Sequence, residues 1–116
     1  MIEAMIKEEI SKDLGKAGLE TLATILYRGP ISRAEINYIR GVNSNYILRS
    51  LQVRGLIEKV ENSPARSTIY QPTFELLSYM GISKVEDLPE YEGVNRAVEE
   101  FKTSQDEEKI EHEDEQ

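Results

Sequence analysis

The chain has 116 residues, a formal net charge of −8, one histidine and no cysteine. This length fits one domain with short extensions, and the lack of cysteine excludes disulfides and thiolate metal sites. No apolar run approaches the ~20 residues that cross a bilayer. The acidic N-terminal stretch is unlike a signal peptide, so we expect a cytoplasmic protein with no membrane contact.

Charge is distributed unevenly along the chain. Residues 16–73 carry a net charge of +4, whereas residues 74–116 carry −10. A phosphate-binding surface needs a clustered positive field. The whole chain lacks such a field, although the central part alone leaves nucleic-acid binding open.

Two amphipathic helices are predicted at the start of the chain. In residues 1–13 the apolar residues recur at helical spacing, which indicates a lead-in helix or linker before a folded domain over 14–90. Over residues 16–28 one helical face carries Leu19, Leu22, Ala23 and Leu26. Gly29-Pro30 ends this helix because proline cannot continue it.

A helix-turn-helix is predicted next. Ser32 to Glu35 has the pattern of a capping box, in which the serine accepts from a free amide and the glutamate reaches back to the cap. Gly41 then ends the helix in a left-handed conformation. Asn43 or Ser44 caps a third helix, which ends at Gly55.

A β-ribbon is predicted after the third helix. Residues 56–61 form one strand, 62–65 a turn and 67–71 the returning strand. Ile31 adds a third strand of one or two residues. The predicted fold is therefore mainly α with a small β-ribbon, a winged helix-turn-helix with a three-helix core and a two-stranded wing.

The remainder is predicted as short helices and an acidic tail. Thr73 caps a helix over 74–80, and a second capping box at 83–86 opens a further turn. Val94, Ala97, Val98 and Phe101 indicate a C-terminal helix over 91–102. Residues 103–116 are polar and acidic, so we expect disorder there.

Several stretches together resemble one protein family. They are Gly18-Leu19-Glu20-Thr21-Leu22-Ala23, Arg33-Ala34-Glu35-Ile36, Ile39-Arg40-Gly41-Val42-Asn43-Ser44, Arg54-Gly55-Leu56-Ile57, Pro72-Thr73-Phe74 and Asp87-Leu88-Pro89. In this order they resemble the C-terminal winged-helix half of ScpB, the segregation and condensation protein B family.

The resemblance implies a non-catalytic adaptor, or kite, subunit of the SMC–ScpA–ScpB complex in chromosome condensation and segregation. Such a subunit binds the central segment of the kleisin ScpA, whose ends bridge the SMC dimer. The resemblance also implies a homodimer, with most of the contact in the family's N-terminal winged helix. No cofactor is implied.

The residues themselves show no catalytic constellation. The single histidine, His112, lies in the acidic tail, and no glycine-rich phosphate loop is present. We therefore predict that the chain is not an enzyme.

Five residues are candidates for partner binding: Arg33, Tyr38, Arg40, Tyr46 and Arg49. Tyrosine and arginine are favoured at the centres of interfaces, but Arg40 has an alternative structural role in pairing with Glu20 or Glu35. Arg49 lies on the helix that reads DNA in other winged helices. A DNA-binding transcriptional regulator is thus the alternative function, and weak nonspecific DNA binding stays open beside it.

Overall fold

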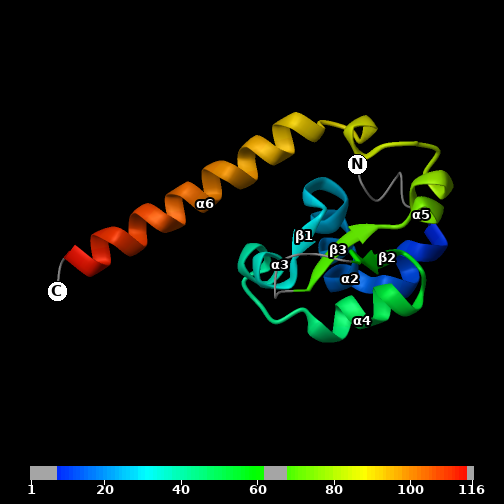
Figure 1. Cartoon of the computed structure of the whole chain (residues 1–116), viewed down its shortest axis with the longest axis horizontal. Helices are drawn as coiled ribbons and strands as arrows, with labels where there is room; N and C mark the ends of the chain where they lie inside the picture. Colours follow the sequence, from blue (N-terminus) through cyan, green and yellow to red (C-terminus); the bar gives the residue numbers. More distant parts are fainter. Residues whose placement is uncertain (1–7, 62–67, 115–116) are drawn as a thin grey trace.

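The computed structural model describes residues 8–61 and 68–114, with side chains placed over 14–61 and 68–105. Its dimensions are 50 × 30 × 25 Å, and the longest dimension follows the C-terminal helix (Figure 1). In chain order the elements are α2 (Glu8–Arg28), β1 (Ile31–Ser32), α3 (Arg33–Arg40), α4 (Asn45–Val53), β2 (Ile57–Lys59), β3 (Ile69–Pro72), α5 (Phe74–Tyr79), a 3-10 turn (Val85–Asp87) and α6 (Tyr91–Asp114).

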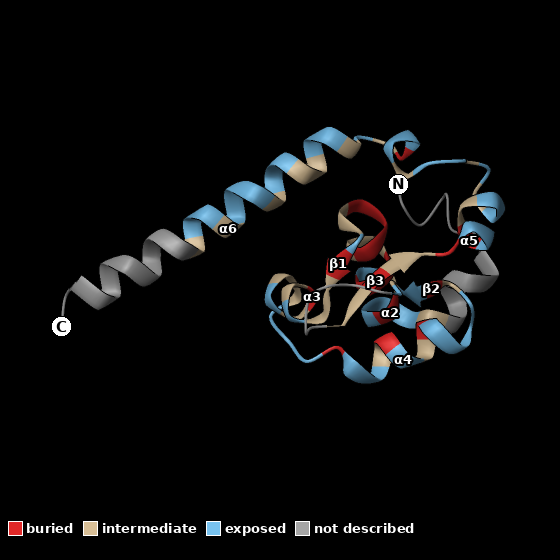
Figure 2. Cartoon of the chain, in the orientation of Figure 1, coloured by how far each residue is buried: buried red, intermediate tan, exposed pale blue. Residues whose placement is uncertain are grey.

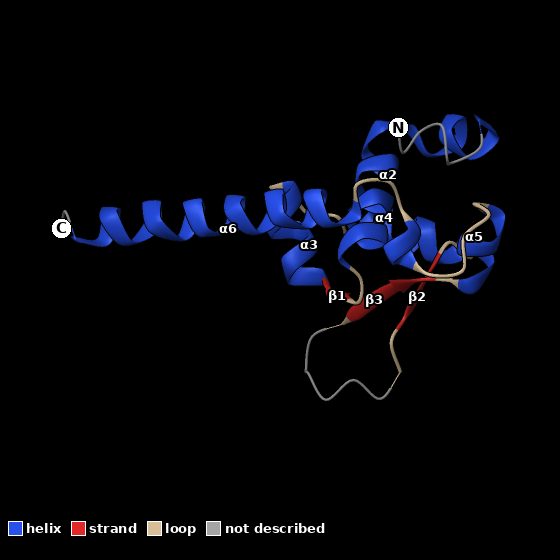
Figure 3. Cartoon of the chain, turned by 90° about the horizontal axis from the view of Figure 1, so that it is seen from above, coloured by secondary structure: helices blue, strands red, loops and turns tan. Residues whose placement is uncertain are grey.

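The sheet has three antiparallel strands in the order β1-β3-β2. Ile31 lies opposite Tyr70, which in turn lies opposite Lys59 on the other side. Figure 3 shows the sheet on one side of the helices, with β3 between β1 and β2. The predicted winged helix is confirmed, including the two-residue third strand at Ile31. The predicted turn at 62–65 lies outside the described residues.

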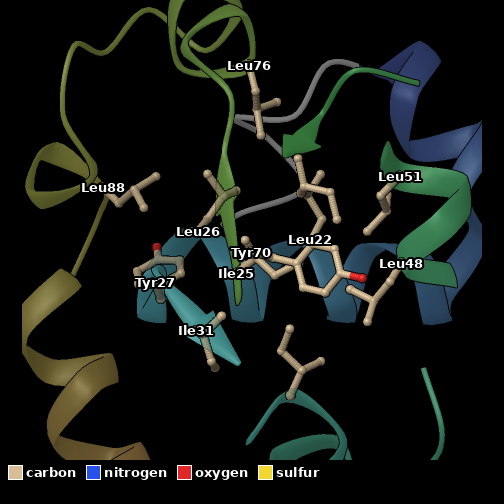
Figure 4. Packing of buried hydrophobic residues seen from close by; sticks show 12 residues of the cluster. Leu22, Ile25, Leu26, Tyr27, Ile31, Leu48, Leu51, Tyr70, Leu76 and Leu88 are labelled. Atoms are coloured by element: carbon tan, nitrogen blue, oxygen red, sulfur yellow. The ribbon is translucent and has the colours of Figure 1, made fainter. Parts of the chain in front are cut away.

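The core lies between α2, the α3–α4 pair and the sheet (Figures 2 and 4). Leu22 and Leu26 of the predicted α2 face are 0% exposed, and Ile36 of α3 and Leu51 of α4 are equally buried. From the far side Leu76 and Leu88 close the cluster. Burial of these side chains stabilises the short helices, because isolated helices of this length are only marginally stable in water.

Local signals account for the ends of α3. The Ser32 hydroxyl accepts from the Glu35 amide at 3.1 Å, and Gly41 has φ 74°, as predicted. The other half of the predicted capping box is wrong. The Glu35 carboxylate bonds Lys102 of α6, a residue 67 positions away.

Other caps differ in detail from the prediction. The α4 helix starts after Ser44, whose hydroxyl makes no capping bond, while Asn43 Oδ1 accepts from the Asn45 amide at 2.8 Å. The 3-10 turn has Lys84 at its cap position and no side-chain cap bond, so the predicted second capping box is wrong. Thr73 caps α5 as predicted, accepting from the Leu76 amide.

The two helices predicted over 1–13 and 16–28 form one kinked element in the structure, and residues 1–7 of the first lie outside the described residues. Helix α2 begins at Glu8 and kinks at Gly15, whose φ is 69°. Helix α6 continues to Asp114, whereas disorder is predicted over 103–116, of which residues 115 and 116 lie outside the described residues. Residues 94–114 contain neither glycine nor proline and include six glutamates, and glutamate is a good helix former. The C-terminal part of α6 projects well beyond the domain (Figures 1 and 3).

Candidate partner-binding surface

The outward side of α4 is open and partly apolar. Leu48 and Leu51 point inward and are buried, so positions 46, 49, 50 and 53 share the opposite face. Tyr46 is 86% exposed and Val53 is 81% exposed, with Arg49 one turn from each. We call Tyr46, Arg49, Ser50 and Val53 the α4 face.

A groove of about 590 Å³ continues this face toward the wing. Its lining residues are Arg33, Asn45, Arg49, Gln52, Val53, Lys59 and Tyr70. Three of them are cations and none is acidic, and Arg33 is positioned by donating to the Tyr70 hydroxyl at 3.1 Å. Arg49 and Val53 belong to both the α4 face and this α4–wing groove, so the two form one surface.

The structure brings three of the five predicted residues to this surface: Arg33, Tyr46 and Arg49. Sequence reasoning missed Lys59, whose place on the groove depends on the pairing of β2 with β3. No local signal could have identified it, because a shift of one residue in strand pairing turns every side chain to the other face.

Arg40 lies elsewhere, inside the domain. Its side chain is 7% exposed, and Nη2 lies 3.6 Å from a Glu20 carboxylate oxygen. Nη1 donates to the Ser44 hydroxyl at 2.7 Å, which ties the end of α3 to the start of α4. Of the two predicted acidic partners, Glu20 is the one that the structure shows. These contacts give Arg40 a structural role, so it is not part of the surface proposed below.

Tyr38 also lies away from the α4–wing groove. Its ring is 43% exposed and lies 6.5 Å from the ring of Phe101 on α6. This contact belongs to a second helical face of the domain, formed by α2 and α3. We call Ala23, Tyr27, Tyr38 and Ile39 the α2–α3 face.

Helix α6 covers the α2–α3 face. Val94 and Val98 line a small apolar hollow together with Ala23, Tyr27 and Ile39. At the root of α6, Tyr91 stacks on Tyr27 with a centroid distance of 6.1 Å. Figure 1 shows α6 leaving the domain from this root.

Charged groups border the covered face. Arg28 of α2 pairs with Glu99 and donates to Asn95 at 2.8 Å, and Lys102 pairs with Glu35 of α3. The bond from Arg28 holds the pKa of Glu99 below its usual range. The bond to Glu35 raises the pKa of Lys102.

Tyr27 anchors the loop before α6. Its hydroxyl donates to the Pro89 carbonyl at 2.8 Å, and burial, together with the charge of Glu90, raises its pKa. Leu88, beside it, is 4% exposed. This part of the chain therefore seals the core.

Two kinds of site are not found in the part of the chain that the structure describes. Over these residues no group of histidine, aspartate and glutamate side chains could hold a metal ion. None of the described helices combines the length and apolar character needed to cross a bilayer.

Comparison with known proteins adds a family match to this description of the fold and surface. Residues 1–91 match the family model described as segregation and condensation complex subunit ScpB. The chain belongs to the ScpB family. The match ends at the first residue of α6, so nearly all of that helix lies beyond it.

Individual ScpB relatives agree with the family match. Segregation and condensation protein B of Lactococcus lactis subsp. cremoris is 41% identical over 86 residues, which are 72% of this chain and 46% of the relative. Its counterpart from Moorella thermoacetica is 39% identical over 94 residues, 79% of this chain and 48% of the relative. The chain thus spans about half the length of the curated relatives it matches.

Solved structures also resemble this chain. ScpB from Mycobacterium tuberculosis matches with a TM-score of 0.56 and 33% identity, over 70% of this chain and 51% of that one. A conserved hypothetical protein from Chlorobium tepidum matches with a TM-score of 0.53 and 30% identity over the same shares. Both structures therefore share their fold with most of this chain.

Proposed function

We propose that this chain is a non-catalytic adaptor subunit of the SMC–ScpA–ScpB complex. In this role it binds the central segment of the kleisin ScpA, and through ScpA it joins SMC in condensing and segregating the chromosome in the cytoplasm. Membership of the ScpB family supports the assignment of the chain to this complex. The open aromatic and cationic surface on α4 supports the binding role and is the observation that carries it.

The α4 face has the chemistry of a protein interface. Tyr46 and Val53 expose large apolar surfaces to water in the isolated domain, and their burial by a partner would be favourable. Arg49 lies between them, and tyrosine and arginine together are typical of interface centres. Tyr46 at 86% exposure has the most surface to bury, so we expect it to contribute most.

The α4–wing groove indicates the charge of the bound segment. Arg33, Arg49 and Lys59 contribute three positive charges, with no acid among the lining residues. A segment with acidic side chains beside apolar ones would match both parts of the surface. We therefore expect the bound ScpA segment to place carboxylates near Arg33 and Lys59 and an apolar side chain near Tyr46.

Titration calorimetry with a central ScpA fragment tests the proposal. The wild-type chain should bind the fragment, and both Tyr46→Ala and Arg49→Glu should weaken binding at least tenfold. Phe74→Ala is the matched aromatic control, because Phe74 is 70% exposed on a different helix. Arg96→Glu is the charge control on the exposed side of α6. No heat at high fragment concentration, or equal loss in the controls, would contradict the proposal.

One observation favours a DNA-binding alternative. The α4–wing groove lies along the helix that enters the major groove in winged-helix DNA readers, and three cations line it. Three phosphate contacts would make the logarithm of the affinity fall with the logarithm of salt at a slope of about −2.7. Exposed Tyr46 and Val53 favour a protein partner instead. Absence of a duplex shift at low salt would eliminate this alternative.

Self-association stays a prediction from the family resemblance. The molar mass of the chain in solution, measured by light scattering, distinguishes monomer from dimer. A monomer is compatible with the adaptor role, because the α4 face is complete within one chain.

A further inference from the structure

The first half of α6 docks on the α2–α3 face through a narrow contact. Val94 and Val98 are only half-buried, and Phe101 is 44% exposed against a Tyr38 that is 43% exposed. An apolar hollow of about 140 Å³ remains between α6 and the domain. Core side chains such as Leu22 and Ile36 are 0% exposed, so α6 is packed much less closely than the core.

Complementary charges set the register of the docked helix. On the domain side, Arg28 and Glu35 lie 4.0 Å apart on α2 and α3. On α6, Glu99 faces Arg28 and Lys102 faces Glu35. These pairs hold only while α6 keeps both its position along the face and its direction.

The contact is anchored at the start of α6, and the helix continues past the domain. At the root, the Tyr27 hydroxyl holds the Pro89 carbonyl, and Glu90 has a positive φ of 55° just before the helix begins. At the other end, α6 extends past the domain beyond the last charge pair (Figures 1 and 3). Motion about Glu90 would therefore lift the helix while Leu88 and the bond from Tyr27 to Pro89 stay in place.

We propose that the α2–α3 face is a docking surface for an amphipathic helix and that α6 occupies it in cis as a detachable strap. The accepted helix has apolar residues at positions i, i+4 and i+7, an acid at i+5 and a base at i+8, as at 94, 98, 101, 99 and 102. A helix from another molecule with this pattern binds the face only after displacing α6. This inference is independent of the ScpA proposal.

Spin-label distances on the full chain test the docked state. The natural sequence has no cysteine, so Ala34→Cys on α3 and Ser104→Cys on α6, both exposed, give one label pair. The parent chain should show one narrow distance. Val98→Glu should give a broad distribution reaching longer distances, whereas Ala97→Glu on the exposed side of α6 should leave the narrow distance intact. An unchanged distribution in Val98→Glu, or a broad one in the parent, would overturn the strap.

Charge exchange tests the register with no change in composition. The double substitution Glu99→Lys with Lys102→Glu keeps the net charge of α6 but opposes both domain charges, so it should broaden the distance distribution. Adding Arg28→Glu and Glu35→Arg should restore the narrow distance. A narrow distance in the first double variant would show that charge does not set the register.

Two further measurements test whether the helix on the α2–α3 face is α6 of the same chain. Dilution of labelled chain with unlabelled chain should leave the narrow distance unchanged, and its loss would show that α6 comes from a second copy. A peptide of residues 91–105 should then shift the Ala23 and Ile39 amide signals of Val98→Glu at millimolar concentration, the range of a short tether. It should leave the same signals of the wild type unmoved. Failure to shift them in Val98→Glu would overturn the docking surface.

Discussion

Two helical faces of the same small domain differ in what covers them. The α4 face leaves Tyr46 and Val53 more than 80% exposed, whereas α6 covers the apolar residues of the α2–α3 face. The charges differ as well. The α4–wing groove has only cations among its charged lining residues, while the α2–α3 face is bordered by one cation and one acid, each with a partner on α6.

This difference shows that the winged helix alone does not decide which surface can receive a partner. Both faces use helices of the same domain, and both combine aromatic or aliphatic groups with arginine. The helix that begins at Tyr91, where the ScpB family match ends, closes one face and leaves the other open. The available surface is therefore set by the segment that follows the domain.

The largest effect on stability is expected from a substitution in the core, because the α4 face and the α2–α3 face both rest on it. Leu22 is 0% exposed, so Leu22→Ala should lower the free energy of unfolding by about 2–5 kcal/mol, from lost burial and the cavity left behind. Denaturant titration measures this loss. Loss of structure on only one face, seen by amide exchange, would mean that the two faces do not share one core.

Tyr46→Ala, on the α4 face, should weaken binding with little change in stability. Truncation of a central interface tyrosine costs about 2 kcal/mol of binding, or roughly 30-fold in affinity. Since Tyr46 is exposed in the free chain, the free energy of unfolding should change by no more than about 0.5 kcal/mol. Calorimetry with the ScpA fragment and denaturant titration check the two values. An equal loss of stability would assign Tyr46 to folding.

Val98→Glu should produce the opposite pattern. A carboxylate in a half-buried apolar contact should lower the free energy of unfolding by about 1–2 kcal/mol as α6 detaches. Affinity for the ScpA fragment should stay within about twofold, because Val98 is not part of the α4 face. A large fall in that affinity would mean that α6 or the face beneath it takes part in ScpA binding.

Acidification should loosen the contact of α6 with the domain, and this is the smallest effect expected. Glu99 faces Arg28 of α2 and Lys102 of α6, with Glu35 of α3 nearby. The pKa of Glu99 is lowered by Arg28. The pair of Glu99 with Arg28 therefore stabilises the docked helix fully above the ordinary glutamate pKa of about 4.3, and this stabilisation is lost as the pH falls through the lowered value. The spin-label distance should broaden over that range, and Glu99→Gln should remove this component. Identical pH profiles for the two chains would contradict it.

Local sequence signals identified the domain but not the strap. Ser32 and Gly41 specify the ends of α3 within a few residues, and Gly29-Pro30 does so for α2, so the helices could be read from sequence. The spacing of Val94, Val98 and Phe101 indicates a helix but not the surface that it meets. Glu35 shows why, because its spacing from Ser32 fits a cap while its carboxylate is used by a lysine 67 residues away.

The candidate surface was also predicted only in part, because local patterns do not show contacts between distant elements. Tyr46 and Arg49 follow from helical periodicity, since Leu48 and Leu51 fix which side of α4 is buried. Arg40 kept two interpretations, partner binding and pairing with Glu20 or Glu35, because spacing along the chain does not show that it meets Glu20 of another helix. Lys59 joins the groove only through the strand register of the wing.

A map of amide chemical shifts on adding the central ScpA fragment tests the central claim most directly. The account predicts that the largest shifts cluster at Tyr46, Arg49, Val53 and Lys59, while signals of Ile39 and Val98 stay in place. Shifts centred on Ile39 and Val98, with the α4 signals unmoved, would contradict it and would identify the strap-covered face as the ScpA site.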